Sequence, residues 1–223
     1  MRPIASMDGR TRALAHFKMH DSHFYVATSA HHSALPAELP SKRTGNDLFS
    51  ALVSIVVSQQ LGVAAADRIF ARVQDACDGQ ITAESAGKAS LARLRAAGLS
   101  GAKVKTIKEI AKAVRNGSLD LFALRRESEE EATIRLTSVW GLGPWSAQMF
   151  LMFGVGHPDI FSVGDLALVR AMERIYGLSK DVPRASLLAL SEAWAPHRSF
   201  ACLLLWKVYR AAPLSPPTTG RHR

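Results

Sequence analysis

The sequence predicts an all-α protein of about nine or ten helices. From residue 47 onwards, apolar residues recur every three or four positions, which is the spacing of one helix face. No segment shows the sustained alternation of apolar and polar residues that marks a half-buried strand. Glycine and proline fall where helices would end and begin. The 223 residues are enough for one large domain, or two small ones, with a real core.

Residues 1–45 are the least regular part of the chain. They hold five of the eight histidines, namely His16, His20, His23, His31 and His32. The first three have helix-like spacing, which could suggest a metal site, but no cysteine and no set of carboxylates joins them. We therefore expect polar positions on a marginal helix and a loop, and no metal. Residues 35–47, with two prolines and a glycine, resemble a linker.

Nine helices are then expected in close succession. Their ranges are 47–61, 63–77, 90–98, 102–117, 129–139, 144–155, 165–177, 184–195 and 198–212. Asp47 suits a helix cap, Gly98 and Gly117 suit helix ends, and Pro144 suits a first helical position. A basic stripe on the fourth helix (Lys105, Lys108, Lys112 and Arg115) is expected to be a solvated face more often than a DNA contact. The tail 213–223 is rich in proline and threonine, and we expect it to be disordered.

Charge and composition narrow the class of protein. The formal net charge is +9, which favours a polyanionic partner such as nucleic acid over ordinary solubility charge. No apolar run approaches the roughly 20 residues of a membrane span, and the N-terminus lacks a signal-like apolar core. The two cysteines, Cys77 and Cys202, are too few for a disulfide framework or an iron–sulfur cluster and suggest a reducing compartment.

The segment 136–165 carries the most specific pattern. A helix runs into Gly141-Leu-Gly143-Pro144, a second helix follows, and a Gly-rich loop then ends in Asp165. Both glycines are expected to take a positive φ or to let another backbone approach closely. The N–H groups of Gly143, Trp145 and Ser146 at the start of the second helix would suit a phosphate. Asp165 also fits the N-cap of the next helix.

These residues resemble a known family. Leu136 to Ala147 are similar to the helix–hairpin–helix of the base-excision DNA glycosylase superfamily, and "HPDIFSVGD" (157–165) resembles its Gly/Pro-rich loop with the essential aspartate. "SQQL" (58–61) and "WAPHRSFACLLLW" (194–206) are similar to the alkylbase branch, of the 3-methyladenine DNA glycosylase II type. The resemblance covers roughly residues 45–210. It implies a two-lobed helical fold, with one lobe at 46–158 and the other formed by 1–45 together with 159–212.

The resemblance also implies roles for individual residues. Asp165 would be the catalytic carboxylate that assists water attack, and Trp145, Met149 and His197 would line the base pocket. Lyase-competent relatives carry a lysine where this chain has Trp145, so we expect a monofunctional enzyme. For Trp145, packing of the hairpin core is nearly as good an explanation, and for His197 a helix-start role is equally good. Trp194 and Trp206 are expected in the core.

Contacts to duplex DNA follow from the same resemblance. Gln60, with Leu61 beside it, would enter the minor groove as a wedge after the damaged base is flipped out, although two solvated glutamines on a turn are common. Gly141, Gly143, Trp145 and Ser146 would bind the DNA backbone, and Gly101 and Lys103 would form a second phosphate-anchoring turn. No cofactor is expected, apart from room for a monovalent cation at the hairpin carbonyls.

The expected function is therefore removal of alkylated purines, of the 3-methyladenine and 7-methylguanine type, in base excision repair. Two alternatives stay open: a non-catalytic helix–hairpin–helix DNA-binding module, and a glycosylase for hypoxanthine, ethenoadenine or uracil. We expect a monomer whose partner is damaged double-stranded DNA, without a membrane. It would act in a bacterial cytoplasm, at the nucleoid, or in a eukaryotic nucleus.

Overall fold

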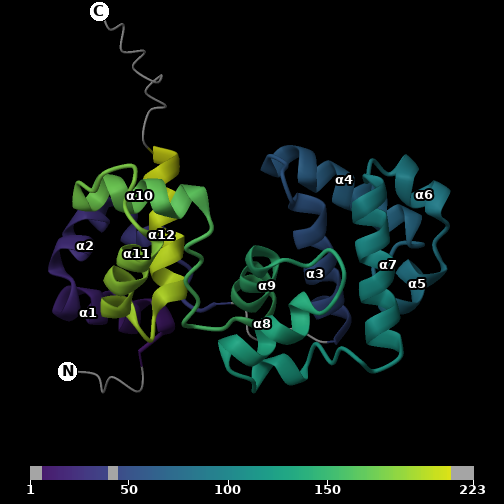
Figure 1. Cartoon of the computed structure of the whole chain (residues 1–223), viewed down its shortest axis with the longest axis horizontal. Helices are drawn as coiled ribbons and strands as arrows, with labels where there is room; N and C mark the ends of the chain where they lie inside the picture. The colour runs from purple at the N-terminus through teal and green to yellow at the C-terminus, as the bar shows by residue number, and fades with distance from the viewer. Residues whose placement is uncertain (1–6, 40–44, 212–223) are drawn as a thin grey trace, which may run out of the picture. The chain divides into compact units, whose positions relative to one another are not determined.

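The computed structural model describes residues 7–39 and 45–211, and within these ranges every regular element is helical (Figure 1). The predicted all-α class is thus confirmed. Residues 40–44 of the expected linker and the tail 213–223 lie outside the described residues. The chain forms two compact units, one of Met1–Ala37 with Phe161–Arg223 and the other of Glu38–Ile160.

The unit of residues 38–160 contains the helices that carry the hairpin and the bend. They are α3 (Gly45–Ser58), α4 (Val63–Ala76), α5 (Ala83–Lys88), α6 (Leu91–Ala96), α7 (Gly101–Arg115), α8 (Glu129–Thr137) and α9 (Pro144–Phe150). A 3₁₀ turn, η3 (Ala123–Arg125), precedes α8, and a π-helical turn, η4 (Leu151–Val155), prolongs α9. Helix α3 packs against α4, α7, α9 and η4, so it is the centre of the unit. Its Leu48, Leu52 and Val56 are fully buried, as the helical spacing predicts.

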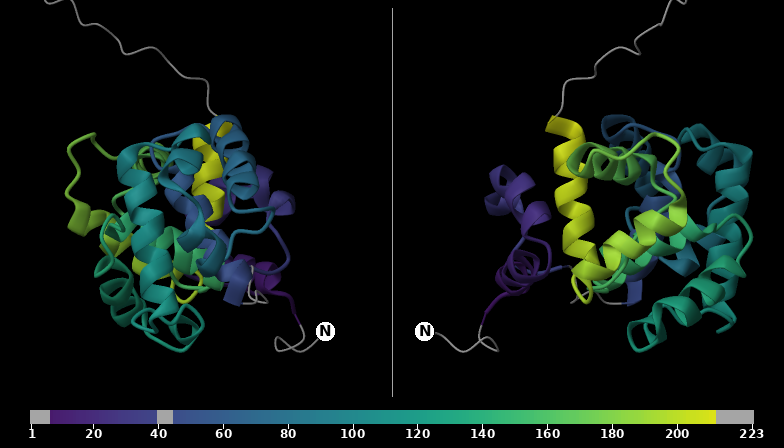
Figure 2. Two further views of the ribbon diagram at one scale, coloured as in Figure 1. Left: turned by 90° about the vertical axis from the view of Figure 1, so that its right-hand side faces the viewer. Right: turned by 60° about the vertical axis from the view of Figure 1, so that its left-hand side comes forward.

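The other unit joins both ends of the described chain. It holds α1 (Gly9–His20), α2 (Ser22–Ala27), η2 (Ser29–Ala34), α10 (Leu166–Tyr176), α11 (Arg184–Ser191), η5 (Glu192–Trp194) and α12 (Arg198–Ala211). Helix α12 lies between the N-terminal helices and α10, and the right-hand view of Figure 2 shows this arrangement. Helix α10 is therefore held in this unit by packing against α12, although it lies far from the N-terminal segment in the sequence.

The N-terminal segment is more ordered than its sequence indicates. Asp21 ends α1 and caps α2, where its side chain accepts a hydrogen bond from Phe24 N at 2.9 Å. Its second oxygen accepts from Tyr176 Oη and, at 3.0 Å, from Trp194 Nε1. Trp194 is fully buried, and its ring lies 4.6 Å from that of Phe24. Tyr176 and Trp194 lie more than 150 residues from Asp21 in the sequence, so no local pattern could have shown that they contact it.

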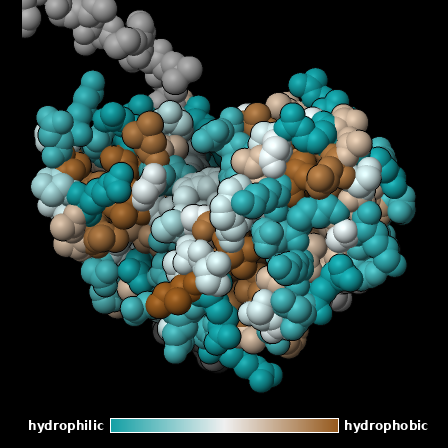
Figure 3. Space-filling view, turned by 45° about the vertical axis from the view of Figure 1, so that its right-hand side comes forward, coloured by the Kyte–Doolittle hydropathy of each residue, from teal (hydrophilic) through white to brown (hydrophobic). Residues whose placement is uncertain are grey.

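The surface mixes polar and apolar side chains. Figure 3 shows hydrophobic residues that reach the surface in small patches among hydrophilic ones. Large exposed hydrophobic side chains include Leu61, Trp140 and Leu166, each beside a predicted site residue. Among the described helices, none is both long and apolar enough to cross a membrane.

Candidate functional site

The hairpin between α8 and α9 depends on one glycine for its shape. Gly141 has a φ of +87°, and a Cβ placed there would lie 1.9 Å from Thr106 Oγ1 on α7. The hairpin backbone therefore touches α7 at a point where only glycine fits. Gly143 has an extended backbone (φ −95°, ψ 174°), and a Cβ there would meet nothing within 4 Å. Gly141 therefore has the predicted positive φ and Gly143 does not, and a close approach of another backbone to Gly143 stays a prediction.

Helix α9 begins as expected, with Gly143 as its N-cap and Pro144 at its first position. Ala147 N donates to Gly143 O at 3.0 Å and closes the first turn. Among the described residues, no side chain caps this end of the helix. The first N–H groups of a helix have no partner within the helix itself. Ser146 is buried, and its hydroxyl accepts a hydrogen bond from Gln59 Nε2 at 2.8 Å.

The bend after α3 presents the two predicted wedge residues. Leu61 N donates to Ser58 O at 3.1 Å and closes the turn. Gln60 is exposed and has a φ of +59°, which is uncommon for a residue other than glycine. Leu61 is 39% exposed. Both side chains therefore stand at the surface of their unit, where a wedge needs to be.

A shallow pocket brings the bend and the hairpin together. Its volume is about 530 Å³. It is lined by Gln59, Gln60, Gly143, Pro144, Trp145 and Ser146. Residues some 85 positions apart in the sequence thus share one surface. Trp145 is half-buried and lines this pocket, whereas Met149, one turn later, is buried.

The basic residues of α7 are largely engaged within their own unit. Lys103 Nζ donates to Val57 O at 2.8 Å and to Gln59 O at 2.7 Å, and burial lowers the pKa of this lysine. Lys105 Nζ lies 4.0 Å from the centre of the Trp140 ring, and Arg115 pairs with Glu84 at 3.0 Å. Gly101 opens the helix, and Ser100 caps it by accepting from Lys103 N. A phosphate role for Gly101 and Lys103 stays a prediction.

Asp165 is the N-cap of α10, as its position predicts. Its Oδ1 accepts from Ala167 N at 2.9 Å and from Leu168 N at 3.2 Å. Its own N–H donates to Ser162 O at 3.0 Å, which closes the loop before the helix. The carboxylate is partly exposed and held in one orientation. A Cβ at Gly164 would meet nothing within 4 Å, so the loop is open on that side.

His197 belongs to the same unit as Asp165 and lies in a group of histidines. Its ring centre is 5.4 Å from that of His16, which stacks on His20 at 4.3 Å. His16 Nε2 lies 3.0 Å from Ala193 O, and His197 N donates to Trp194 O at 2.7 Å. Within the described ranges, no group of three or more histidine, cysteine or acidic side chains is arranged to hold a metal ion. Of the two tryptophans expected in the core, Trp194 is fully buried and Trp206 half-buried.

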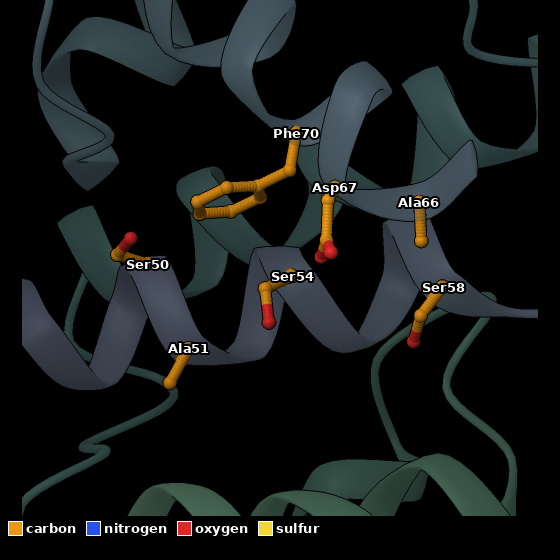
Figure 4. A pocket seen from close by; sticks show the side chains of 7 residues that line it. All are labelled: Ser50, Ala51, Ser54, Ser58, Ala66, Asp67 and Phe70. Carbon is orange, nitrogen blue, oxygen red and sulfur yellow. The ribbon is translucent and has the colours of Figure 1, made fainter. Parts of the chain in front are cut away.

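A second cavity was not anticipated from the sequence. It measures about 370 Å³, lies between α3 and α4, and is lined by Ser50, Ala51, Ser54, Ser58, Ala66, Asp67 and Phe70 (Figure 4). The four-residue spacing of the three serines, which places them on one helix face, is the signal that could have revealed it. None of the predicted site residues lines this cavity.

The family model and the sequence relatives that match this chain agree on one protein family. The model of the HhH-GPD superfamily of base excision DNA repair proteins matches residues 53–196. DNA-3-methyladenine glycosylase 1 of Schizosaccharomyces pombe is 32% identical over 172 residues, which are 76% of this chain and 75% of that protein. YfjP of Bacillus subtilis, named as a DNA-3-methyladenine glycosylase, is 33% identical over 99 residues, and this match spans 34% of that protein.

The solved structures that are similar to this chain carry the same kind of name as its sequence relatives. The crystal structure of a DNA-3-methyladenine glycosidase from Bacillus halodurans has a TM-score of 0.76 and 32% identity, and the match covers 89% of each chain. The 3-methyladenine DNA glycosylase Mag1 of Schizosaccharomyces pombe, solved in complex with abasic DNA, has a TM-score of 0.80 and 28% identity. That match covers 92% of this chain and all of the other.

Proposed function

This chain belongs to the HhH-GPD superfamily, in its 3-methyladenine DNA glycosylase branch, and from that premise we propose that it is a monofunctional glycosylase for alkylated purines. It would hydrolyse the bond between the base and C1′ of the deoxyribose and leave an intact abasic site. The observation that carries the proposal is Asp165, a partly exposed carboxylate fixed by two backbone N–H groups at the end of a Gly-rich loop.

Asp165 would act on the sugar. As the C1′–N bond breaks, its electron pair leaves with the base, and the sugar becomes oxocarbenium-like. A nearby carboxylate stabilises this positive charge, and it can orient the water that adds to C1′ and accept the proton that the water loses. Because Oδ1 is held by Ala167 N and Leu168 N, the carboxylate does not have to reorganise during the reaction.

Alkylated purines suit a site with one carboxylate. A base that already carries a positive charge is a good leaving group and needs little protonation by an acid. The face of Trp145, in the pocket beside the bend, could attract such a cationic base by about 1–2 kcal/mol when water is excluded. Met149 and His197 would complete the base pocket. They give it fewer electron-rich rings than a fully aromatic pocket has, so hypoxanthine, ethenoadenine and uracil remain the competing lesions.

Lyase activity would require an amine. The residue at the critical place after the hairpin is Trp145, and Ser146, Ala147 and Gln148 follow it. None of these side chains can form a Schiff base with C1′. We therefore propose hydrolysis alone.

Damaged duplex DNA would be held at the hairpin and the bend. The N-terminal N–H groups of α9 suit a phosphate, and the open space beside Gly143 would let that phosphate come close to the backbone. Gln60, with Leu61, would fill the gap left by the flipped base. The complex of the related Mag1 with abasic DNA supports this partner.

The test is base release from a panel of duplexes that each carry one lesion. We expect release of 3-methyladenine and 7-methylguanine, with uncut strands. Release of only hypoxanthine, ethenoadenine or uracil would assign the enzyme to another substrate. DNA binding without release of any base would instead favour a non-catalytic hairpin module.

A further inference from the structure

Lys103 is an unusual residue for its place on α7. It lies in the first turn of that helix, two residues after Gly101. A positive charge near a helix N-terminus is unfavourable, because the helix dipole is positive there. Its side chain instead reaches the opposite kind of helix end, the C-terminus of α3, where carbonyl groups lack partners and a positive charge is favourable.

The contacts of Lys103 lie directly beside the bend. Its Nζ donates to Val57 O in the last turn of α3 and to Gln59 O, one residue before Gln60. Gln60 itself holds a left-handed backbone, which a residue with a side chain adopts only when its surroundings impose it. The two hydrogen bonds of Lys103 fix the carbonyls on either side of Ser58 and so define how the chain leaves α3.

A second contact ties the same bend to the hairpin helix. Gln59 Nε2 donates to Ser146 Oγ at 2.8 Å, and Ser146 is buried in the first turn of α9. The backbone of Gln59 is thus held by α7 and its side chain by α9. Gln60 is the next residue in the chain, and its side chain is exposed.

We propose that Lys103 is a positioning residue, which acts through the bend to present Gln60 to the gap in the duplex, and that the Gln59–Ser146 bond sets the bend in register with the hairpin. This inference rests on the proposed function, since it concerns the same wedge. Under this proposal the main role of Lys103 is to position the bend, and not to contact a phosphate of the DNA. Burial also lowers the pKa of Lys103, as expected for an ammonium group drawn into the protein.

The same helix supplies a matched control. Lys108 is also on α7, and its Nζ donates to Gly87 O at 2.8 Å and to Ala89 O at the end of α5. Burial lowers the pKa of Lys108 as well. Lys108 therefore makes the same kind of contact to the end of a helix, but at a helix that has no part in the bend.

The experiment compares Lys103→Met with Lys108→Met. Affinity is measured for a duplex with a tetrahydrofuran abasic analogue and for the same duplex undamaged, at several salt concentrations. Lys103→Met should lower the preference for the abasic duplex about tenfold, because the wedge offsets part of the cost of unstacking the duplex. Lys108→Met should stay within about twofold of wild type. Ser146→Ala should lower the preference for the abasic duplex by a smaller factor, because it removes only the Gln59–Ser146 bond.

A double mutant separates positioning from general destabilisation. If Lys103 acts through Gln60, Lys103→Met should cause no further loss of preference in a Gln60→Ala background. An equal loss on both duplexes, with a salt slope reduced by about 0.9, would identify a phosphate contact and overturn the inference. Identical effects of Lys103→Met and Lys108→Met would overturn it as well.

The same measurements distinguish this inference from the proposed function. They use DNA that cannot be hydrolysed, so they do not depend on base release. A protein that prefers abasic DNA but releases no base would contradict the proposed chemistry and leave the role of Lys103 standing. A wild-type protein without that preference would overturn the wedge and this inference together.

Discussion

At the scale of single residues, the two hairpin glycines have different reasons to be glycine. Gly141 needs its left-handed φ and the absence of a Cβ, because the hairpin backbone rests on Thr106. Gly143 needs neither within its own unit, since its backbone is extended and the space beside it is open. The sequence motif contains both glycines and cannot distinguish an internal constraint from one imposed by a bound phosphate.

The pair Gly141→Ala and Gly143→Ala tests this difference. Gly141→Ala should destabilise the fold by about 2 kcal/mol or more, through steric overlap and backbone strain. Gly143→Ala should melt close to wild type but bind duplex DNA more weakly, because its methyl group would occupy the space proposed for a phosphate. Thermal melting and DNA affinity of both variants provide the measurements. Equal stability of the two variants would contradict the internal role of Gly141.

Trp145 determines the chemistry that is expected at C1′. With a tryptophan in place of an amine, product strands should remain uncut until alkali or heat is applied. Gel analysis of the DNA after turnover measures this directly. Trapping of a covalent protein–DNA adduct by borohydride during turnover would show that another amine serves as nucleophile and that the monofunctional assignment is wrong.

At the scale of elements, the bend after α3 is a short segment clamped by two neighbours. Gln60→Ala should weaken binding to an abasic duplex more than binding to an undamaged duplex, since only the former has a gap for the side chain. Titration of each duplex with wild type and variant measures the two losses of affinity that are to be compared. If both fall equally, Gln60 contacts the DNA backbone, and the wedge role passes to Leu61.

The junction of α1 and α2 gives a prediction about stability. Burial and the neighbouring Asp21 raise the pKa of Tyr176 well above its ordinary value of 10. The unfolded chain therefore loses this proton at lower pH than the folded chain does, and the stabilisation, complete below about pH 10, should decline as the pH rises further.

Denaturant unfolding as a function of pH tests this. The loss of stability above pH 10 should be smaller in Tyr176→Phe, which has no proton to release at this position. The variant should also be less stable at neutral pH, because its ring cannot donate to Asp21. An identical alkaline decline in both proteins would contradict a raised pKa for Tyr176.

Local patterns predicted most of these elements because each long helix has an apolar face, a cap or a terminal glycine of its own. The N-terminal helices and α5 also have local caps, but α2 and α5 are only six residues long and α1 has no marked apolar face, so the sequence pattern did not specify them. Helices α1 and α2 depend on Asp21, Phe24 and Trp194, which meet only in the folded chain. For the same reason the sequence located Asp165 and the hairpin but not the contacts of Lys103, whose partners lie 44 and 46 residues away.

At the scale of the whole molecule, each unit carries a different part of the proposed activity. The unit of residues 38–160 holds the hairpin and the bend, which would bind DNA and fill the gap left by the flipped base. The unit that joins the two ends of the chain holds Asp165 and His197, which would act on the sugar and the base. Binding and chemistry should therefore be separable by mutation.

Asp165→Asn, assayed for single-turnover release of 3-methyladenine from duplex DNA, tests the central claim most directly. Asparagine can still accept the hydrogen bonds of Ala167 N and Leu168 N, so the cap, the melting temperature and the affinity for abasic DNA should be retained. Base release should fall by at least about 10²-fold, because the charge that stabilises the transition state is lost. Release at a near wild-type rate by the folded variant would contradict the assignment of Asp165 as the catalytic carboxylate.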